Sequence, residues 1–196
     1  EMARAVIEAF LPYDYTVVPS GSCGGMVSHH YPGLFGDDPQ LRAKADSLAA
    51  KTYELIAFLT DVMGAERVEA RLDGVATYHD SCSGLRELGI KQQPRRLLAS
   101  VKGLTLKEMR DPEVCCGFGG TFCVKYPGIS TKMVSDKARD VAATGADGVC
   151  GTGSPASCTA SSHSRPVGLS GRPASGAASR TTRWSIGAGA KRSACW

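Results

Sequence analysis

Two adjacent cysteines in a glycine-rich segment are the residues of this sequence best suited to chemistry. Cys115 and Cys116 begin the string Cys-Cys-Gly-Phe-Gly-Gly-Thr-Phe, and Cys82 lies upstream of them in the string Tyr-His-Asp-Ser-Cys. Neighbouring cysteines are poor disulfide partners for each other, because a bond between them is strained. They suit a metal cluster, which needs several thiolates from different chain segments at one place. Since glycines let the backbone turn sharply there, the pattern predicts an iron–sulfur site.

Three cysteines of this pattern account for most of one cluster. A 4Fe–4S cluster takes four thiolates, and Cys82, Cys115 and Cys116 supply three of them. Zinc is the alternative metal, because four thiolates also suit a tetrahedral zinc ion. Zinc sites mostly use Cys-x-x-Cys pairs, so adjacent cysteines favour an iron–sulfur cluster over zinc. His79, three residues before Cys82, either hydrogen-bonds a cluster sulfur or is an ordinary histidine at the end of a strand.

The composition is typical of a globular protein with a redox or metal role. The chain has 196 residues, of which 42% are hydrophobic, which is enough for the core of one domain or slightly more. It has no apolar run of about 18 residues, so we expect no membrane span. Eight cysteines without a visible secretory signal indicate a reducing compartment, which predicts a cytoplasmic location.

Charge is distributed unevenly along the chain. The formal net charge is +4, but residues 1–150 carry 17 Lys and Arg against 19 Asp and Glu. Residues 151–196 carry six basic residues and no acidic one, in a composition rich in Ser, Gly, Ala, Arg, Thr and Pro. We therefore expect residues 151–196 to be disordered. The first 150 residues show no basic face with interleaved aromatics, so we expect no nucleic-acid binding.

Strand-like and helix-like segments alternate along residues 1–150. Apolar periodicity predicts strands at 15–19, 75–79, 104–109 and 145–149. It predicts helices at 2–10, 26–30, 39–63, 94–100 and 130–143, a short helix that ends at 86–89, and a loop at 20–25. This alternation is typical of an α/β fold with a parallel sheet flanked by helices. The cysteine loops then lie at the C-terminal ends of strands, where such sheets bind ligands.

The cysteines belong to a longer pattern that resembles a known family. Pro19-Ser-Gly-Ser-Cys23, Tyr78-His-Asp-Ser-Cys82 and Cys115-Cys-Gly-Phe-Gly-Gly-Thr-Phe122 resemble the cysteine-rich CCG-domain proteins. That superfamily includes a cysteine-rich component of heterodisulfide reductase and the iron–sulfur subunits of glycolate oxidase and anaerobic glycerol-3-phosphate dehydrogenase. The chain looks most similar to the lactate-utilization branch, over residues 1 to about 150.

The resemblance implies a domain organisation. Family members contain two repeats, each with a first cysteine, a Cys-Cys-Gly and a closing cysteine. Residues 1–64 then hold the end of the first repeat with a connecting helix, residues 65–150 hold the second repeat, and residues 151–196 are the tail. Cys23 matches the closing cysteine of the first repeat, whose other cysteines are missing. We therefore expect this sequence to be an N-terminal truncation.

The closing cysteine of the second repeat stands outside its family context. The family pattern places a Ser-Cys motif after the strand at 145–149, whereas this chain reads Cys150-Gly-Thr-Gly-Ser-Pro-Ala-Ser-Cys158. Codons for residues 153–159, read one base earlier, permit Val-Ser-Cys-Leu-Leu-His, which is the family's closing motif. We therefore expect a frameshift near this point and an out-of-frame tail. Cys158 or Cys150 would then act as the fourth ligand by position alone.

The resemblance implies an iron–sulfur electron-transfer subunit. Such a subunit would belong to a cytoplasmic complex that oxidises L-lactate to pyruvate with sibling iron–sulfur and accessory subunits. Its cluster would be held by Cys82, Cys115, Cys116 and a closing cysteine. Two alternatives stay open, a heterodisulfide or thiol reductase subunit and a zinc-stabilised interaction domain. The sequence has neither a phosphate-binding Gly-x-x-x-x-Gly-Lys-Ser/Thr motif nor a dinucleotide-binding Gly-x-Gly-x-x-Gly before a helix.

Overall fold

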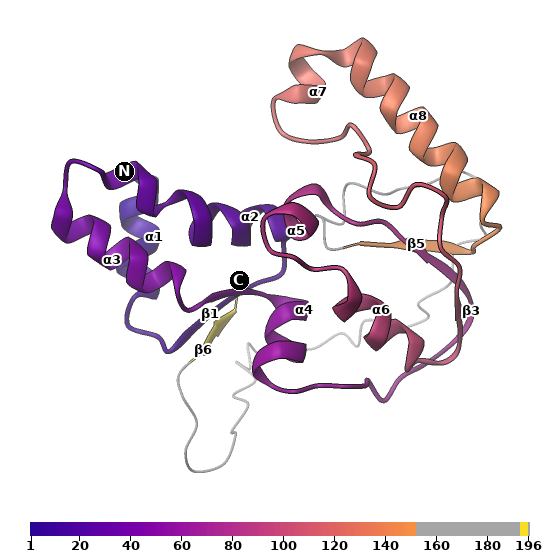
Figure 1. Cartoon of the computed structure of the whole chain (residues 1–196), viewed down its shortest axis with the longest axis horizontal. Coiled ribbons are helices and arrows are strands. Elements are labelled where there is room, and N and C mark those ends of the chain that lie inside the picture. The colour runs from indigo at the N-terminus through magenta and orange to yellow at the C-terminus, as the bar shows by residue number, and fades with distance from the viewer. Residues whose placement is uncertain (152–192, 196) are drawn as a thin grey trace, which may run out of the picture.

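Two parallel sheets of three strands each form the framework of the chain (Figure 1). The computed structural model describes residues 1–151 and 193–195. The strand order is β2-β1-β6 in the first sheet and β4-β3-β5 in the second. The strands are β1 Tyr15–Val18, β2 Thr52–Glu54, β3 Arg71–Tyr78, β4 Lys102–Leu106, β5 Gly148–Cys150 and β6 Ser193–Cys195. All pairings in these sheets are parallel, which confirms the predicted α/β class.

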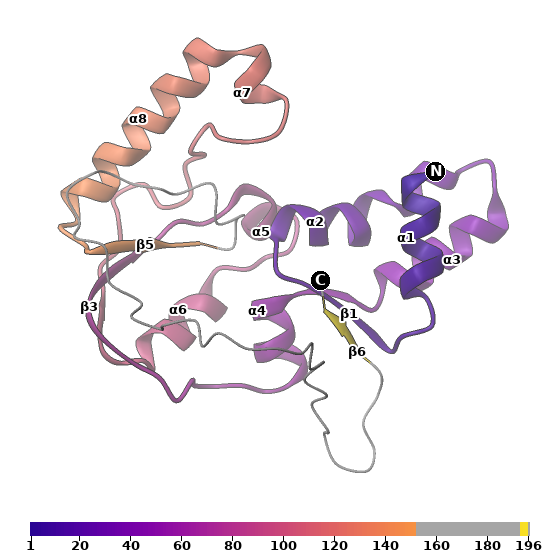
Figure 2. The ribbon, with the colours of Figure 1, turned by 180° about the vertical axis from the view of Figure 1, so that it is seen from behind.

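Helices flank both sheets. They are α1 Met2–Phe10, α2 Gly21–Gly25, α3 Pro39–Ala49, α4 Leu55–Ala57, α5 Cys82–Arg86, α6 Gln92–Ala99, α7 Phe122–Lys125 and α8 Pro127–Ala143. The π-helical turns η1 Met26–His30 and η3 Phe58–Val62 and the 3-10 turn η2 Pro32–Phe35 complete the set of described helices. In Figures 1 and 2, α8 and α6 lie on opposite sides of β5. Among the described helices, none combines the length and apolar character that crossing a membrane requires.

The core of the N-terminal part lies between α1, η1 and α3. Apart from Tyr31, which directly follows η1, its buried residues come from helical segments that the sequence predicts at 2–10, 26–30 and the first half of 39–63. They are Ile7, Val27, Tyr31, Leu41, Ala45 and Leu48. Ile7, Ala45 and Leu48 are 0% exposed, and Asp38 begins α3 by accepting a hydrogen bond from the Leu41 N–H at 3.0 Å. This cap satisfies one of the free N–H groups of the first helical turn.

The predicted single helix over 39–63 is wrong, because a strand interrupts it. α3 ends at Ala49, and β2 pairs with β1 in the register Thr16↔Thr52, Val17↔Tyr53 and Val18↔Glu54. The Thr52 hydroxyl donates to the Leu48 carbonyl at 2.8 Å and so occupies an acceptor at the end of α3. The apolar residues whose spacing suggests one helix therefore lie on a helix, then a strand, then a second helix. Pairing of β2 with β1 overrides the helical preference of this stretch.

The first cysteine segment differs from the sequence prediction too. The sequence predicts a loop at 20–25, but α2 begins at Gly21 directly after β1 and continues into η1. Within residues 151–196, predicted to be disordered, the structure describes only Gly151 and the short strand β6, which lies beside β1.

The helices that carry Cys23 and Cys82 touch through two glycines (Figure 2). α2 follows β1, α5 follows β3, and the two short helices lie side by side in both views. A Cβ atom added at Gly21 would lie 2.8 Å from the Gly84 nitrogen and 2.9 Å from its Cα. Backbone atoms cannot move aside as a flexible side chain can, so this contact requires glycine at position 21. The contact joins α2, which follows β1 of the first sheet, to α5, which follows β3 of the second sheet.

A methyl group at this contact is expected to destabilise the protein. We predict that Gly21→Ala lowers the free energy of unfolding by about 1–3 kcal/mol, the usual effect of overpacking. Urea denaturation followed by circular dichroism measures this change. Gly33→Ala is the matched control, because a Cβ at Gly33 meets nothing within 4 Å. Equal losses in the two variants would contradict the role given to the glycine contact.

Candidate metal centre

Two cysteine segments meet beyond the ends of the second sheet. Cys82 is the first residue of α5, directly after β3, and Cys115 and Cys116 lie in the segment between β4 and α7. The Cys115 side chain lies near enough to Cys82 to change its pKa. Burial raises the pKa of Cys82 to about 11, and the neighbouring Cys115 thiol and the charge of Cys116 add to this rise, against a smaller opposing effect of Arg86. The fold therefore brings thiols from two distant segments close to each other.

Gly117 shapes the Cys-Cys-Gly turn. Its φ is +75°, a left-handed conformation that favours glycine, and its N–H donates to Cys115 Sγ at 3.3 Å. A Cβ at this position would lie 2.5 Å from Met133 Cβ and 3.0 Å from the Ser130 carbonyl oxygen. The Ser130 hydroxyl donates to the Gly117 carbonyl at 2.8 Å. The turn is thus pressed against α8, and only glycine fits there.

α8 also holds the segment that precedes the two cysteines. The Asp140 carboxylate accepts hydrogen bonds from the backbone N–H groups of Arg110 at 3.0 Å and Asp111 at 2.9 Å. Lys137 donates to the carbonyl of Asp111 from the same helix. Between this segment and α8 lies a cavity of about 110 Å³, whose lining includes Cys115 and Lys137. The loop that carries Cys115 is therefore bound to one face of one helix.

His79 links β3 to the same segment. Its backbone N–H donates to the Cys150 carbonyl at 2.8 Å, and its Nδ1 lies 3.1 Å from the Pro112 carbonyl oxygen. Because a carbonyl only accepts, Nδ1 carries the proton in this contact. Burial, assisted by the charge of Lys137, lowers the pKa of His79, while the bond to Pro112 and the charge of Asp80 act in the other direction. Of the two interpretations of His79, these contacts favour an ordinary histidine at the end of a strand over one that hydrogen-bonds a cluster sulfur.

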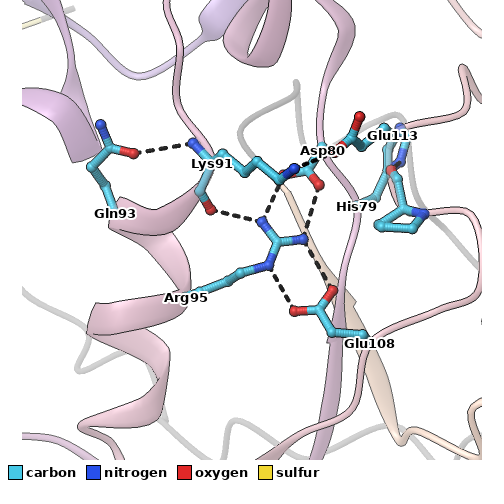
Figure 3. A network of polar contacts seen from close by, with 8 residues as sticks. His79, Asp80, Lys91, Gln93, Arg95, Glu108 and Glu113 are labelled. Carbon is cyan, nitrogen blue, oxygen red and sulfur yellow. Dashed lines mark hydrogen bonds and ion pairs between the residues drawn. The ribbon is translucent and has the colours of Figure 1, made fainter.

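One arginine of α6 joins the ends of β3 and β4 (Figure 3). Nη1 and Nη2 of Arg95 each donate to a carboxylate oxygen of Asp80 at 2.8 Å. Nε and Nη2 donate to the carboxylate of Glu108 at 2.7 and 3.0 Å, and Nη1 donates to the Lys91 carbonyl at 2.7 Å. Asp80 follows β3, and Glu108 follows β4. A single planar guanidinium therefore fixes the spacing of the two strand ends from which the cysteine segments leave.

Most of this ion-pair network is buried. The side chain of Asp80 is 0% exposed and that of Arg95 is 14% exposed, whereas Glu108 is 45% exposed. The Arg95 guanidinium carbon lies 5.0 Å from the centre of the Tyr78 ring, whose face attracts a cation. Hydrogen bonds to Asp80 and then Glu108 raise the pKa of Arg95 further above its ordinary value. A buried pair of this kind is strongly destabilising to break, because one charge is left without water or partner.

The structure treats the candidate site residues differently. It brings Cys82 and Cys115 together, whereas Cys116 Sγ lies 4.0 Å from the Phe118 carbonyl oxygen. Cys23 lies exposed on α2, and Cys158 is outside the described residues. In the part of the chain that the structure describes, no three His, Cys, Asp or Glu side chains gather closely enough to hold one metal ion.

Sequence reasoning missed the residues that support the cysteine segments. Arg95, Lys137 and Asp140 are not singled out by the sequence, because each is an ordinary charged residue of a helix. Their partners lie 13 to 30 positions away, so no local motif marks them. A weak signal exists for Asp80, since a carboxylate next to a buried strand and two residues from a cysteine calls for a cationic partner.

Part of the chain matches the family of cysteine-rich CCG domains. Residues 76–160 match the sequence profile of that family, and this stretch includes the end of β3, all of β4 and β5, and all three cysteines of the predicted cluster. The match confirms the family resemblance inferred from the Cys-Cys-Gly pattern.

The chain is similar to curated bacterial proteins named lactate utilization protein A. It is 49% identical over 151 residues to lactate utilization protein A of Bacillus cytotoxicus and 48% identical over 151 residues to that of Geobacillus kaustophilus. It is 47% identical over 151 residues to lactate utilization protein A 2 of Bacillus mycoides. Each alignment covers 77% of this chain and 63% of the relative, so the chain spans less than two thirds of the proteins it matches.

Loss of the Arg95 charge is expected to be costly. Arg95→Met leaves the Asp80 carboxylate buried without its partner, and we predict that it lowers the free energy of unfolding by about 3–5 kcal/mol. The neighbouring variant Arg96→Met is the control, because Arg96 is exposed on the same helix. It should change the free energy by no more than about 0.5 kcal/mol. Urea denaturation of both variants measures the difference, and similar losses would argue against the network.

The Cys-Cys-Gly turn offers a second matched pair of variants. Gly117→Ala places a methyl group against Met133 at a positive φ, so we predict a loss of about 1–3 kcal/mol in unfolding free energy and reduced metal uptake. Gly119→Ala lies in the same loop, and a Cβ there meets nothing within 4 Å. Metal analysis after anaerobic reconstitution compares the two. Equal metal content in both variants would show that the turn geometry does not matter.

Proposed function

We propose that this chain is part of an iron–sulfur subunit that transfers electrons in the oxidation of L-lactate to pyruvate. The observation that carries the proposal is the convergence of Cys82, directly after β3, and Cys115, in the segment after β4, near enough for Cys115 to shift the pKa of Cys82. Thiols from separate segments that come together beside a glycine-rich turn suit a shared cluster. The adjacent cysteines Cys115 and Cys116 are poor disulfide partners for each other.

The residues present fit a 4Fe–4S cluster in their chemistry. Cys82, Cys115 and Cys116 would supply three thiolates, and a closing cysteine, Cys158 or Cys150 by position, would supply the fourth. When bound, such a cluster accepts and donates single electrons. The chain's own task is to hold the thiols in place, which Gly117 does for Cys115 through its N–H and Arg95 does for the two strand ends. Cys23 would belong to a separate site in the first repeat.

The two sheets support a division of the chain into domains, although the strand β6 of the first sheet comes from residues 193–195. Residues 1–64 hold β1 and β2 with the helices around them, and residues 65–150 hold β3, β4 and β5. We infer that these are the end of the first CCG repeat with its connecting helix and the second repeat. Residues 151–196 would be a tail read out of frame. The similar placement of α2 after β1 and α5 after β3 supports a repeated design.

The substrate and partners come from the relatives alone. Their name, lactate utilization protein A, connects proteins 47–49% identical to this chain with lactate. We infer a cytoplasmic complex in which sibling iron–sulfur and accessory subunits pass electrons from lactate through this protein. A heterodisulfide or thiol reductase subunit is the second candidate, because other CCG proteins act on disulfides. Lactate and disulfide turnover in the assembled complex would distinguish the two.

Metal analysis of the chain tests the cluster first. After anaerobic reconstitution with iron and sulfide, we expect about four iron and four sulfide per chain and a broad absorption near 400 nm. Cys82→Ser and Cys115→Ser should each lose most of the iron, because each removes a ligand. Cys123→Ser is the control, since Cys123 lies on α7 and its thiol contacts the Gly120 carbonyl at 3.3 Å.

The zinc alternative has its own outcome in this experiment. One zinc per chain with no visible absorption would favour a zinc-stabilised interaction domain over an electron carrier. Iron that is retained in Cys82→Ser and Cys115→Ser would overturn the assignment of these ligands. Iron lost equally from Cys123→Ser would mean that the loss reflects the fold and not the site.

A further inference from the structure

Lys137 is a buried cation that neither the cysteine pair nor the Arg95 network uses. Only 7% of the residue is exposed. Its ammonium donates to the Asp111 carbonyl and lies 3.8 Å from the sulfur of Met109, and both of these groups are neutral. Lysine is almost never buried to this degree unless its charge is balanced. An anion that balances this ammonium is therefore expected close by.

No carboxylate of the described residues forms an ion pair with Lys137. Three aspartates line the same cavity, but each is engaged by another group. Their partners are Lys132 and Arg139 for Asp136, Arg110 for Asp111, and the backbone N–H groups of residues 110 and 111 for Asp140. These carboxylates lower the positive electrostatic potential around Lys137, but none of them forms an ion pair with its ammonium.

The group near Lys137 that would carry negative charge is the cysteine site with its cluster bound. Lys137 and Cys115 line the same cavity between the loop and α8. The charge of Lys137 also acts on His79, which stands three residues before Cys82. The ammonium thus lies beside the segment of Cys115 and near enough to His79 to act on its charge. A cluster bound by four thiolates is negatively charged, and its reduction potential depends on net charge and surroundings.

We propose that Lys137 balances the negative charge of the cluster held by Cys82, Cys115 and Cys116, and so raises the reduction potential of that cluster. The inference rests on the proposed function and deepens it by assigning a residue that sets the potential. On reduction one electron enters the cluster from the reductant, no bond is broken, and Lys137 keeps its protons. The more negative reduced state gains more from a nearby positive charge in a medium of low dielectric constant.

Three variants of the full chain test this assignment. Lys137→Met keeps the length of the side chain and removes the charge, Lys137→Arg keeps the charge, and Lys132→Met removes a charge from the surface of the same helix. The Lys132 side chain is 69% exposed, so water and salt screen its charge. Each protein is reconstituted anaerobically, its iron and sulfide are measured, and its potential is determined by a dye-mediated titration followed by EPR.

The expected result is a selective shift. Lys137→Met should favour the oxidised cluster at least about tenfold, a fall in potential of about 59 mV for one electron. Lys137→Arg and Lys132→Met should remain within about a third of that shift. A merely structural role would leave the potential of the assembled cluster unchanged, so an unchanged potential in Lys137→Met overturns the inference.

Iron content keeps the test decisive when a variant fails to assemble its cluster. If Lys137→Met binds no iron and Lys137→Arg binds as much as the unaltered chain, the positive charge is required and the inference stands. If both lose iron, the charge is not what matters and the inference is overturned. An unaltered chain without iron and sulfide would overturn the proposed function as well, whereas a normal cluster with an insensitive potential overturns the role of Lys137 alone.

Discussion

The geometry of the cysteine site depends on the bidentate ion pair between Arg95 and Asp80. Asp80 is fully buried, so its charge is tolerated only because a guanidinium on α6 meets both of its oxygens at 2.8 Å. The same guanidinium binds Glu108 beyond β4. The chain leaves β3 toward Cys82 and leaves β4 toward Cys115. The Arg95 side chain therefore fixes the relative positions of the ends of β3 and β4. The segments that carry Cys82 and Cys115 begin at these two strand ends.

The opposite side of the site is held by α8. Before the two cysteines, Asp140 accepts hydrogen bonds from backbone N–H groups and Lys137 donates one to a backbone carbonyl. After them, the Ser130 hydroxyl donates to the carbonyl of Gly117. These contacts are necessary because the loop cannot hold itself: Val114 and Phe118 are more than half exposed and contribute little to a core. Helices on two sides thus fix a loop that has almost no hydrophobic anchor. Hydrogen bonds to backbone atoms do so without constraining the cysteine side chains, which stay available for ligands.

Local patterns predict the parts of this structure that depend on local forces. The Cys-Cys-Gly string predicts a turn that only glycine permits, and Gly117 with its φ of +75° is that turn. The strand before Cys82 and the helix over 130–143 likewise follow from periodicity. The break between α3 and β2 does not, since apolar spacing does not reveal that Thr52 pairs with Thr16. The Arg95 and Lys137 contacts escape prediction because they join residues that only the folded chain brings together.

Arg95 and Lys137 are both largely withdrawn from water, and they differ in what balances their charges. Arg95 faces two carboxylates, so its charge is neutralised in every state of the site and serves to fix geometry. Lys137 faces a carbonyl and a thioether, and its charge is left over. A cation that is paired with carboxylates has little net electrostatic effect on a group further away, because the opposite charges largely cancel. A buried cation without a paired carboxylate would stabilise a negative charge nearby more strongly. α6 and α8 lie on opposite sides of β5, so Arg95 and Lys137 approach the cysteine site from different sides, and under our proposal one would fix its geometry and the other its electrostatics.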